Sequence, residues 1–145
     1  MTQLFNKNAI ENKIHAMIEQ ANDTHTRIAV GFLDIDNFRD YNTLYGHQEG
    51  DRVIRFVASI LKENINGIVG RNGGDEFLLC LAAVDSKTTI ENEIRTVFEK
   101  LQEGLINLET GERMSIPCSI GIFAENGSQL HYSYMVQGAD AAMYQ

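Results

Sequence analysis

The sequence RNGGDEF, residues 71–77, places two glycines before two adjacent acids, and a long apolar run follows it. Asn-Gly and Gly-Gly pairs supply the positive φ angles that tight hairpin turns require. Residues 68–71 and 76–84 are therefore predicted to be the two strands of a β-hairpin. Glycine also lacks a Cβ atom, so a ligand can approach the backbone of such a turn closely. The stretch fits an ordinary turn and also a turn that holds a ligand.

The segments around this hairpin alternate between helix and strand patterns. Residues 28–35 (IAVGFLDI) are apolar on both faces until Asp34, which is typical of a central strand covered on both sides. Helices are predicted at residues 8–21, 37–44, 49–63, 88–101 and 134–144. Asp36 is a candidate N-cap for the second of these helices. Residues 114–123 form a further predicted strand, with Pro117 at an edge or a bulge.

The predicted elements define a fold class. They run helix, strand, two helices, hairpin, helix, strand, helix. The core of this order is β-α-β-β-α-β, the split arrangement of a ferredoxin-like fold. We therefore expect an α+β domain, a ferredoxin-like palm in which helices flank a mostly antiparallel central sheet. A length of 145 residues fits one such domain.

Composition argues against several kinds of partner. The formal net charge is −8, so nucleic acid and an anionic membrane surface would be repelled. A phosphate-bearing small molecule is compatible with this charge if a cation bridges it. No apolar run reaches the roughly 18 residues of a membrane span, and the first residues lack the layout of a secretion signal. Cys80 and Cys118 lie in apolar runs, which indicates buried thiols in a reducing compartment and hence a cytoplasmic location.

Two acids are predicted to meet at one end of the sheet. Asp34 ends one central strand, and Asp75 opens another just past the hairpin turn. If these strands are antiparallel neighbours, the two carboxylates face each other and repel unless a proton or cation lies between them. A hard divalent ion such as Mg²⁺ suits oxygen ligands and leaves room for phosphate oxygens. The alternatives are a site for metal-assisted phosphoryl or nucleotidyl transfer and two acids that are simply solvated.

Several spaced motifs are shared with one family of enzymes. Residues 73–77 spell GGDEF, and residues 32–51 (FLDIDNFRDYNTLYGHQEGD) carry acidic, asparagine and Gly-His-x-x-Gly-Asp positions at matching spacing. Arg71 precedes the glycine pair, and residues 119–121 (SIG) match a late strand motif. Over nearly its whole length the chain resembles the catalytic domain of GGDEF-type diguanylate cyclases. The resemblance implies the nucleotide cyclase version of the palm fold.

The resemblance also implies a reaction and a metal site. Two GTP molecules become cyclic di-GMP and two pyrophosphates, because each 3′-hydroxyl attacks the α-phosphate of the other nucleotide. Asp34 and Asp75 match the metal-binding acids, with the backbone carbonyl of Ile35 assisting, and the metal is Mg²⁺ with Mn²⁺ as an alternative. Glu76 matches either a further metal ligand or a group that helps to deprotonate the 3′-hydroxyl. Asp34, Asp75 and Glu76 are therefore the predicted catalytic residues.

Other positions match the nucleotide-binding part of the family pattern. Asn42 and Asp51 match the residues that read guanine, and a carboxylate can accept hydrogen bonds from N1–H and N2–H₂ of that base together. Arg39 stands where the family has a lysine on the phosphate side. Phe38 is either a core residue or a wall of the nucleotide site. His47 is a candidate general base, although a loop histidine before a helix is the simpler interpretation. Substrate contacts are also predicted for Gly73 and Gly74.

Three features depart from the family pattern. Many members carry an Arg-x-x-Asp inhibitory site where this chain has Asn64 and Gly67, so we expect no product inhibition there. Asn8 and Gln3 replace the usual arginine and glycine near the start. The sequence stops at Gln145, before the Ala-Lys pair whose lysine contacts phosphate in the family.

Two functions stay open at this point. One is an active cyclase, and the other is a catalytically silent GGDEF domain that binds GTP and regulates a neighbouring domain. The cyclase needs a homodimer, because its product has two-fold symmetry. Residues 1–145 are expected to be a single GGDEF domain excised from a longer signalling protein, fused to a sensor or dimerisation domain. That parent protein could be membrane-anchored, although no membrane contact is expected from this segment.

Overall fold

The computed structural model of the chain describes residues 4–82, 87–108 and 110–143. Its helices and strands are, in order, α1 (Lys7–Thr24), β1 (Arg27–Ile35), α2 (Phe38–Tyr45), α3 (His47–Asn64), β2 (Ile68–Arg71), β3 (Glu76–Ala82), α4 (Lys87–Glu103), β4 (Leu105–Ile106), β5 (Arg113–Met114), β6 (Cys118–Asn126) and α5 (Tyr132–Met143). No helix in these ranges is both long and apolar enough to cross a membrane.

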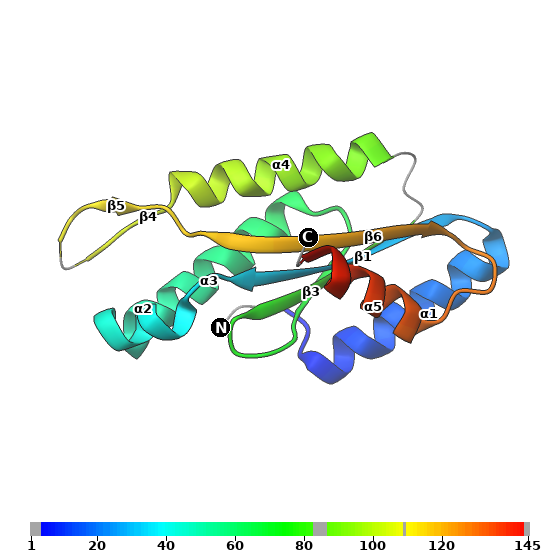
Figure 1. The fold of residues 1–145 in the computed structure, drawn as a ribbon, viewed down its shortest axis with the longest axis horizontal. Coiled ribbons are helices and arrows are strands. Elements are labelled where there is room, and N and C mark those ends of the chain that lie inside the picture. Colours follow the sequence, from blue (N-terminus) through cyan, green and yellow to red (C-terminus); the bar gives the residue numbers. More distant parts are fainter. Residues whose placement is uncertain (1–3, 83–86, 109, 144–145) are drawn as a thin grey trace.

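One antiparallel sheet organises the domain. Its strand order is β2-β3-β1-β6, and β1 pairs with β3 on one side and β6 on the other (Figure 1). β2 and β3 form the predicted hairpin and pair from Ile68↔Cys80 to Arg71↔Phe77. The predicted α+β fold class is therefore confirmed, as is the central position of the strand at residues 28–35.

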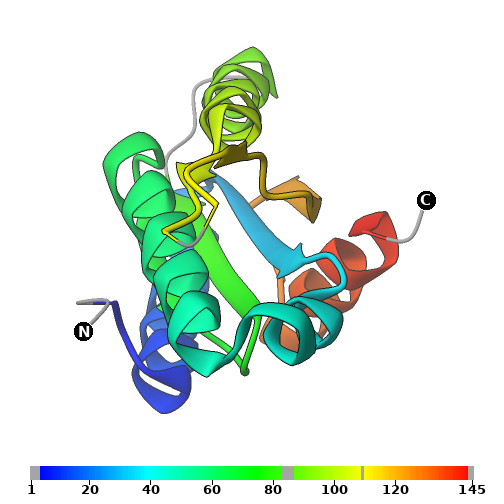
Figure 2. The same cartoon turned by 90° about the vertical axis from the view of Figure 1, so that its left-hand side faces the viewer.

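The sheet is covered on both faces because side chains alternate along each strand. Ala29 and Leu33 of β1 face one apolar cluster, which also contains buried residues of α3 and α4. Ile28, Val30 and Phe32 face the other, which contains buried residues of α1 and α5. Figure 2 shows these helices on either side of the strands. This double cover explains why residues 28–33 are apolar at successive positions rather than alternating with polar residues.

The predicted N-cap of α2 is wrong. The residue that precedes the helix is Asn37, which has a left-handed φ of 56° and makes no side-chain cap hydrogen bond. Asp36 instead lies against β6, where its backbone N–H donates to the carbonyl of Pro117 (2.9 Å) and its carboxylate accepts from Ser119 Oγ (2.8 Å). These two bonds hold Asp36 to the neighbouring strand, so its side chain does not cap the helix.

The strand predicted at residues 114–123 is divided. Met114 belongs to the short strand β5, which pairs with β4, whereas β6 begins only at Cys118. Pro117 lies between the two strands, where its lack of an N–H group removes no ladder bond. The β4–β5 hairpin was not predicted, because strands of two residues show no alternating pattern. The last helix begins at Tyr132, two residues before the predicted start. The predicted end of the second hairpin strand, Val84, and the predicted end of the last helix, Tyr144, lie outside the described residues.

The predicted burial of the two cysteines is confirmed for Cys80 and only partly for Cys118. Cys80 is buried in the centre of β3, and Cys118 at the start of β6 is half-buried rather than fully enclosed. Neither is in a disulfide. Burial raises the pKa of each thiol to about 12, so neither is a reactive thiolate at neutral pH.

A glycine lets α5 lie directly on the sheet. A Cβ atom added to Gly121 in β6 would overlap the backbone carbonyl oxygen of Ala139 and the backbone nitrogen of Met143. Because these atoms are backbone, they cannot move aside without moving the helix. The late Ser-Ile-Gly motif therefore has a packing explanation in this fold.

Replacing that glycine is expected to loosen the helix. Gly121→Ala should lower the free energy of unfolding by about 1–3 kcal/mol, the usual range for overpacking, as measured by urea denaturation. Gly74→Ala is the control, because a Cβ there meets no atom within 4 Å and should change stability little. Equal stability of wild type and Gly121→Ala would contradict the packing described here.

Candidate active site

The pairing of β1 with β3 brings the predicted acids together. The register places Asp34 directly opposite Glu76 at the end of the sheet, so their side chains lie on the same face. Asp75 comes just before β3, and its carbonyl accepts a hydrogen bond from the N–H of Ile35 (3.1 Å). Asp34, Ile35 and Asp75 line one cavity of about 490 Å³. The expectation that these carboxylates meet at one end of the sheet is thus met.

Asp34 is in an unfavourable electrostatic environment for a carboxylate. Its Oδ1 atom is buried and has no hydrogen-bond partner among the described residues. Burial is the main cause that raises the pKa of Asp34 to about 6, and the negative charge of Asp75 is the next largest. Glu76 and Asp36 add further repulsion. A cation beside Asp34 would relieve all of these effects at once.

The donor atoms suit a hard divalent ion bound only in part by the protein. In the described parts of the chain, no group of three or more His, Cys, Asp or Glu residues could hold a metal ion by itself. Asp34 and Asp75 offer carboxylate oxygens from two strands. Mg²⁺ is commonly bound through one or two carboxylates, with water and substrate phosphates completing its coordination. These residues therefore fit Mg²⁺ or Mn²⁺ that arrives with a phosphate ligand.

The turn before β3 is held by its own hydrogen bonds. The backbone N–H groups of Asn72 and Gly73 donate to the carbonyl of Glu76 (2.8 and 3.3 Å). The Arg71 guanidinium donates to the carbonyls of Gly73 (Nε, 3.1 Å) and Gly74 (Nη2, 2.6 Å). The Glu76 carboxylate accepts from the side-chain amide of Asn72 (2.5 Å). Arg71 was predicted only as a motif position, and here it braces the turn.

The predicted backbone conformation of this turn is wrong. Asn72, Gly73 and Gly74 do not adopt positive φ. The loop has four residues, 72–75, as the predicted strand bounds imply, and a loop of this length does not need the primed turn types of two-residue hairpins. A Cβ added to Gly74 would meet nothing within 4 Å, and at Gly73 the nearest atom would be 4.0 Å away. No contact within the chain requires glycine at either position, so the space beside the turn is open.

A second cavity adjoins the first. It measures about 450 Å³, and its lining includes Phe38, Arg39 and Asn42 from α2 together with Gly74 and Asp75 from the turn. Phe38, Arg39 and Asp75 line both cavities, so the two lie side by side. Most of the predicted substrate-binding residues therefore surround one space.

Two of the predicted substrate-binding residues are not part of that lining. Gly73 is exposed and lines neither cavity, and neither does Asp51, which is exposed on the first turn of α3. His47 does line the second cavity. Contacts of Gly73 and Asp51 with a nucleotide stay predictions, as does a role for Glu76 in metal binding.

Gly50 is a site residue that was not predicted. A Cβ atom at this position of α3 would overlap Oδ1 of Asn42, so the glycine makes room for the asparagine side chain. That amide oxygen is buried without a hydrogen-bond partner in the described chain. A glycine inside an otherwise regular helix was the available signal, because glycine there lowers helix stability. Close packing of α2 on α3 explains it.

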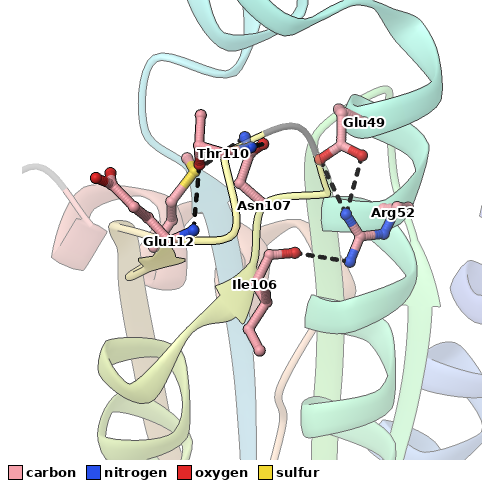
Figure 3. A network of polar contacts seen from close by, with 7 residues as sticks. Glu49, Arg52, Ile106, Asn107, Thr110 and Glu112 are labelled. Atoms are coloured by element: carbon pink, nitrogen blue, oxygen red, sulfur yellow. Dashed lines mark hydrogen bonds and ion pairs between the residues drawn. The ribbon is translucent and has the colours of Figure 1, made fainter.

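A polar network fixes the first turn of α3 to the β4–β5 hairpin (Figure 3). Glu49 is only 7% exposed and accepts from Arg52 Nη1 through both carboxylate oxygens (2.9 and 3.0 Å). Arg52 Nη2 donates to the carbonyl of Ile106 in β4 (3.0 Å). Inside the hairpin, Asn107 Oδ1 accepts from the N–H of Thr110 (3.1 Å). Glu49 and Arg52 lie on either side of residue 51 in the sequence, so the network holds the helical turn that carries this residue in place.

Comparison with known proteins agrees with this architecture. A family model described as diguanylate cyclase, GGDEF domain, matches residues 1–145. The chain is 30% identical over 146 residues to diguanylate cyclase DosC of Escherichia coli (strain K12), covering 99% of this chain and 31% of DosC. It is 33% identical over 152 residues to cyclic di-GMP phosphodiesterase PdeR of the same strain, covering 99% of this chain and 21% of PdeR.

A solved structure gives the same result. The crystal structure of the GGDEF domain of DgcB from Caulobacter crescentus in complex with c-di-GMP matches with a TM-score of 0.88 and 27% identity, covering 97% of this chain and 84% of that chain. The chain belongs to the GGDEF family of diguanylate cyclase domains. It spans about a third or less of the length of DosC and PdeR.

The position of Asp34 predicts how stability depends on pH without metal. Because the folded-state pKa of Asp34 (about 6) is above its ordinary value of 3.8, ionisation destabilises the fold as pH rises through this interval. Asp34→Asn should therefore be more stable than wild type by about 1 kcal/mol at neutral pH, a value reduced for partial exposure. The difference should disappear toward about pH 4.

Urea denaturation in the presence of a chelator measures this effect. Asp23→Asn, a change at an exposed position of α1, is the control and should show no such pH dependence. Adding Mg²⁺ should reduce the advantage of Asp34→Asn. A variant less stable than wild type at neutral pH would contradict the electrostatic description.

Proposed function

We propose that the chain is the catalytic domain of a diguanylate cyclase, which condenses two GTP molecules into cyclic di-GMP with release of two pyrophosphates. The observation that carries this proposal is the convergence of Asp34 and Asp75 on a cavity beside an open glycine turn, where one buried oxygen of Asp34 has no partner among the described residues. Family membership and the name of DosC support the same activity.

The residues suit this reaction. The 3′-hydroxyl oxygen of one GTP forms a bond to the α-phosphorus of the other, and the bond to the β-phosphate oxygen breaks. Asp34 and Asp75, with the Ile35 carbonyl, would hold the divalent ion, which when bound offsets the negative charge of the phosphates. Glu76 lies across from Asp34 and is either a third ligand or the group that helps the 3′-hydroxyl lose its proton.

The nucleotide would extend from these acids toward α2 and α3. Arg39 lines both cavities and would meet the phosphates. Asn42 lines the second cavity, and its side-chain amide suits the remaining polar edge of guanine. Asp51 would accept from N1–H and N2–H₂, a donor pair that adenine lacks. Phe38 would form one wall of the nucleotide site.

The product constrains the assembly. Cyclic di-GMP has two-fold symmetry, and each GTP supplies one nucleophile and one α-phosphate. Two copies of the site must therefore face each other across a homodimer. DosC and PdeR are several times longer than this chain, which supports fusion of the domain to sensor or dimerisation segments in the parent protein.

A silent, GTP-binding domain is the second candidate. PdeR, 33% identical to this chain, is named a cyclic di-GMP phosphodiesterase, so the same domain occurs in a protein named for breakdown of the dinucleotide. Such a domain would keep the nucleotide cavity and act on a neighbouring domain. The two candidates differ in turnover, not in GTP binding.

Turnover of GTP separates these candidates. Incubation with GTP and Mg²⁺, with the chain alone and fused to a dimerising coiled coil, should yield cyclic di-GMP detectable by mass spectrometry. Asp75→Asn removes a predicted metal ligand and should lower the rate by about 100-fold or more. GTP binding by the dimeric wild type without any product would contradict the cyclase proposal and favour the silent domain.

Product inhibition at the usual position is not expected. Asn64 donates through its side-chain amide to the carbonyl of Ile60 (2.8 Å), so it completes the end of α3. Gly67 has no side chain, and a Cβ there would overlap the carbonyl oxygen of Cys80. Neither residue can make the charge-assisted contacts that grip a dinucleotide phosphate.

Initial rates with added cyclic di-GMP measure this directly. We expect the added cyclic di-GMP to compete only weakly with GTP. Arg55→Met, a change at an exposed arginine of α3, should behave like wild type. Strong noncompetitive inhibition that persists in this variant would show that a different surface binds the product.

A further inference from the structure

A groove runs between α4 and the outer edge of the sheet. Its cavity measures about 690 Å³, larger than either cavity at the candidate active site, and shares no lining residue with them. Ile94 and Phe98 line it from α4, and Ile122 and Ala124 line it from β6. No strand among the described residues pairs with the outer side of β6, which α4 overlies in Figure 1. Phe98 is left 38% exposed.

Arginines accompany this apolar lining. Arg27, at the start of β1, and Arg95, on α4, both line the groove. The Nε atom of Arg27 is buried and finds no hydrogen-bond partner in the described ranges. Leaving a buried donor unpaired is unfavourable for folding. Arg95 donates to Asn92 Oδ1 (3.2 Å). Glu91 also lines the groove, so the net charge of Arg27, Arg95 and Glu91 is one positive charge.

We propose that this groove binds a small amphipathic molecule with an apolar body and a single carboxylate. The carboxylate would pair with the guanidinium of Arg27, one of the two arginines that line the groove, in a charge-assisted bond. The apolar body would lie against Phe98 and Ile122 and remove them from water. The volume is in the usual range for small-molecule sites, which are mostly apolar with few polar anchors. A single negative charge matches the lining better than a phosphate dianion, because Glu91 repels added charge.

Decanoate and decanol are suitable probes because they share a chain length and differ in the charged head. Isothermal titration should show one saturable decanoate site. Arg27→Met should weaken decanoate binding at least about tenfold while leaving decanol binding within about twofold. Ala124→Phe, which fills the groove, should abolish binding of both probes. Arg55→Met removes an exposed arginine on α3 and serves as the matched control.

The outcomes separate this proposal from the alternatives. No saturable decanoate binding, or equal losses in Arg27→Met and Arg55→Met, would overturn it. A dimer that Ile122→Arg converts to monomer, combined with absence of decanoate binding, would assign the groove to a second copy of the chain. If Arg27→Met is unfolded by circular dichroism, Arg27→Gln replaces it. The binding test does not depend on cyclase activity, because the probes are titrated in the absence of GTP.

Discussion

The antiparallel pairing of β1 with β3 is the constraint on which the candidate site depends. It places Asp34 across from Glu76 and beside Asp75, which concentrates negative charge at one end of the sheet. The apolar faces of β1 are buried on both sides, and this burial opposes the destabilising effect of that repulsion. Asp34 lines a cavity, its pKa is raised, and one of its carboxylate oxygens is buried without a partner in the described part of the chain, a combination that is common at functional sites.

The second part of the site is built by helix packing. α2 follows β1 directly, and α3 packs on α2 where Gly50 leaves room for the side chain of Asn42. Arg52 then ties the start of α3 to the β4–β5 hairpin. These contacts fix the predicted nucleotide-binding residues relative to the acids of the sheet, and the proposed reaction between two nucleotides would require such positioning.

The fold was predictable because apolar residues recur at regular spacing along the main helices and strands. The buried strand at residues 28–35 and the hairpin around the glycine pair predicted that Asp34 lies near Asp75 if the two strands are antiparallel neighbours, as β1 and β3 are. Local details were harder, because they depend on tertiary contacts. Asp36 is held by Ser119 of a strand 83 residues away, so its capping prediction was wrong. A glycine inside a helix marked Gly50 as unusual, but its role depends on the side chain of Asn42 in another helix, which the sequence around Gly50 does not reveal.

The central claim is that Asp34 and Asp75 share one divalent ion. Electron paramagnetic resonance of Mn²⁺ in the presence of a non-reactive GTP analogue measures it in wild type, Asp34→Asn, Asp75→Asn and the double variant. We expect one bound ion per chain, about tenfold or greater loss of Mn²⁺ affinity in each single variant, and little further loss in the double variant. Wild-type affinity in both single variants, or losses that add independently in the double variant, would contradict the claim.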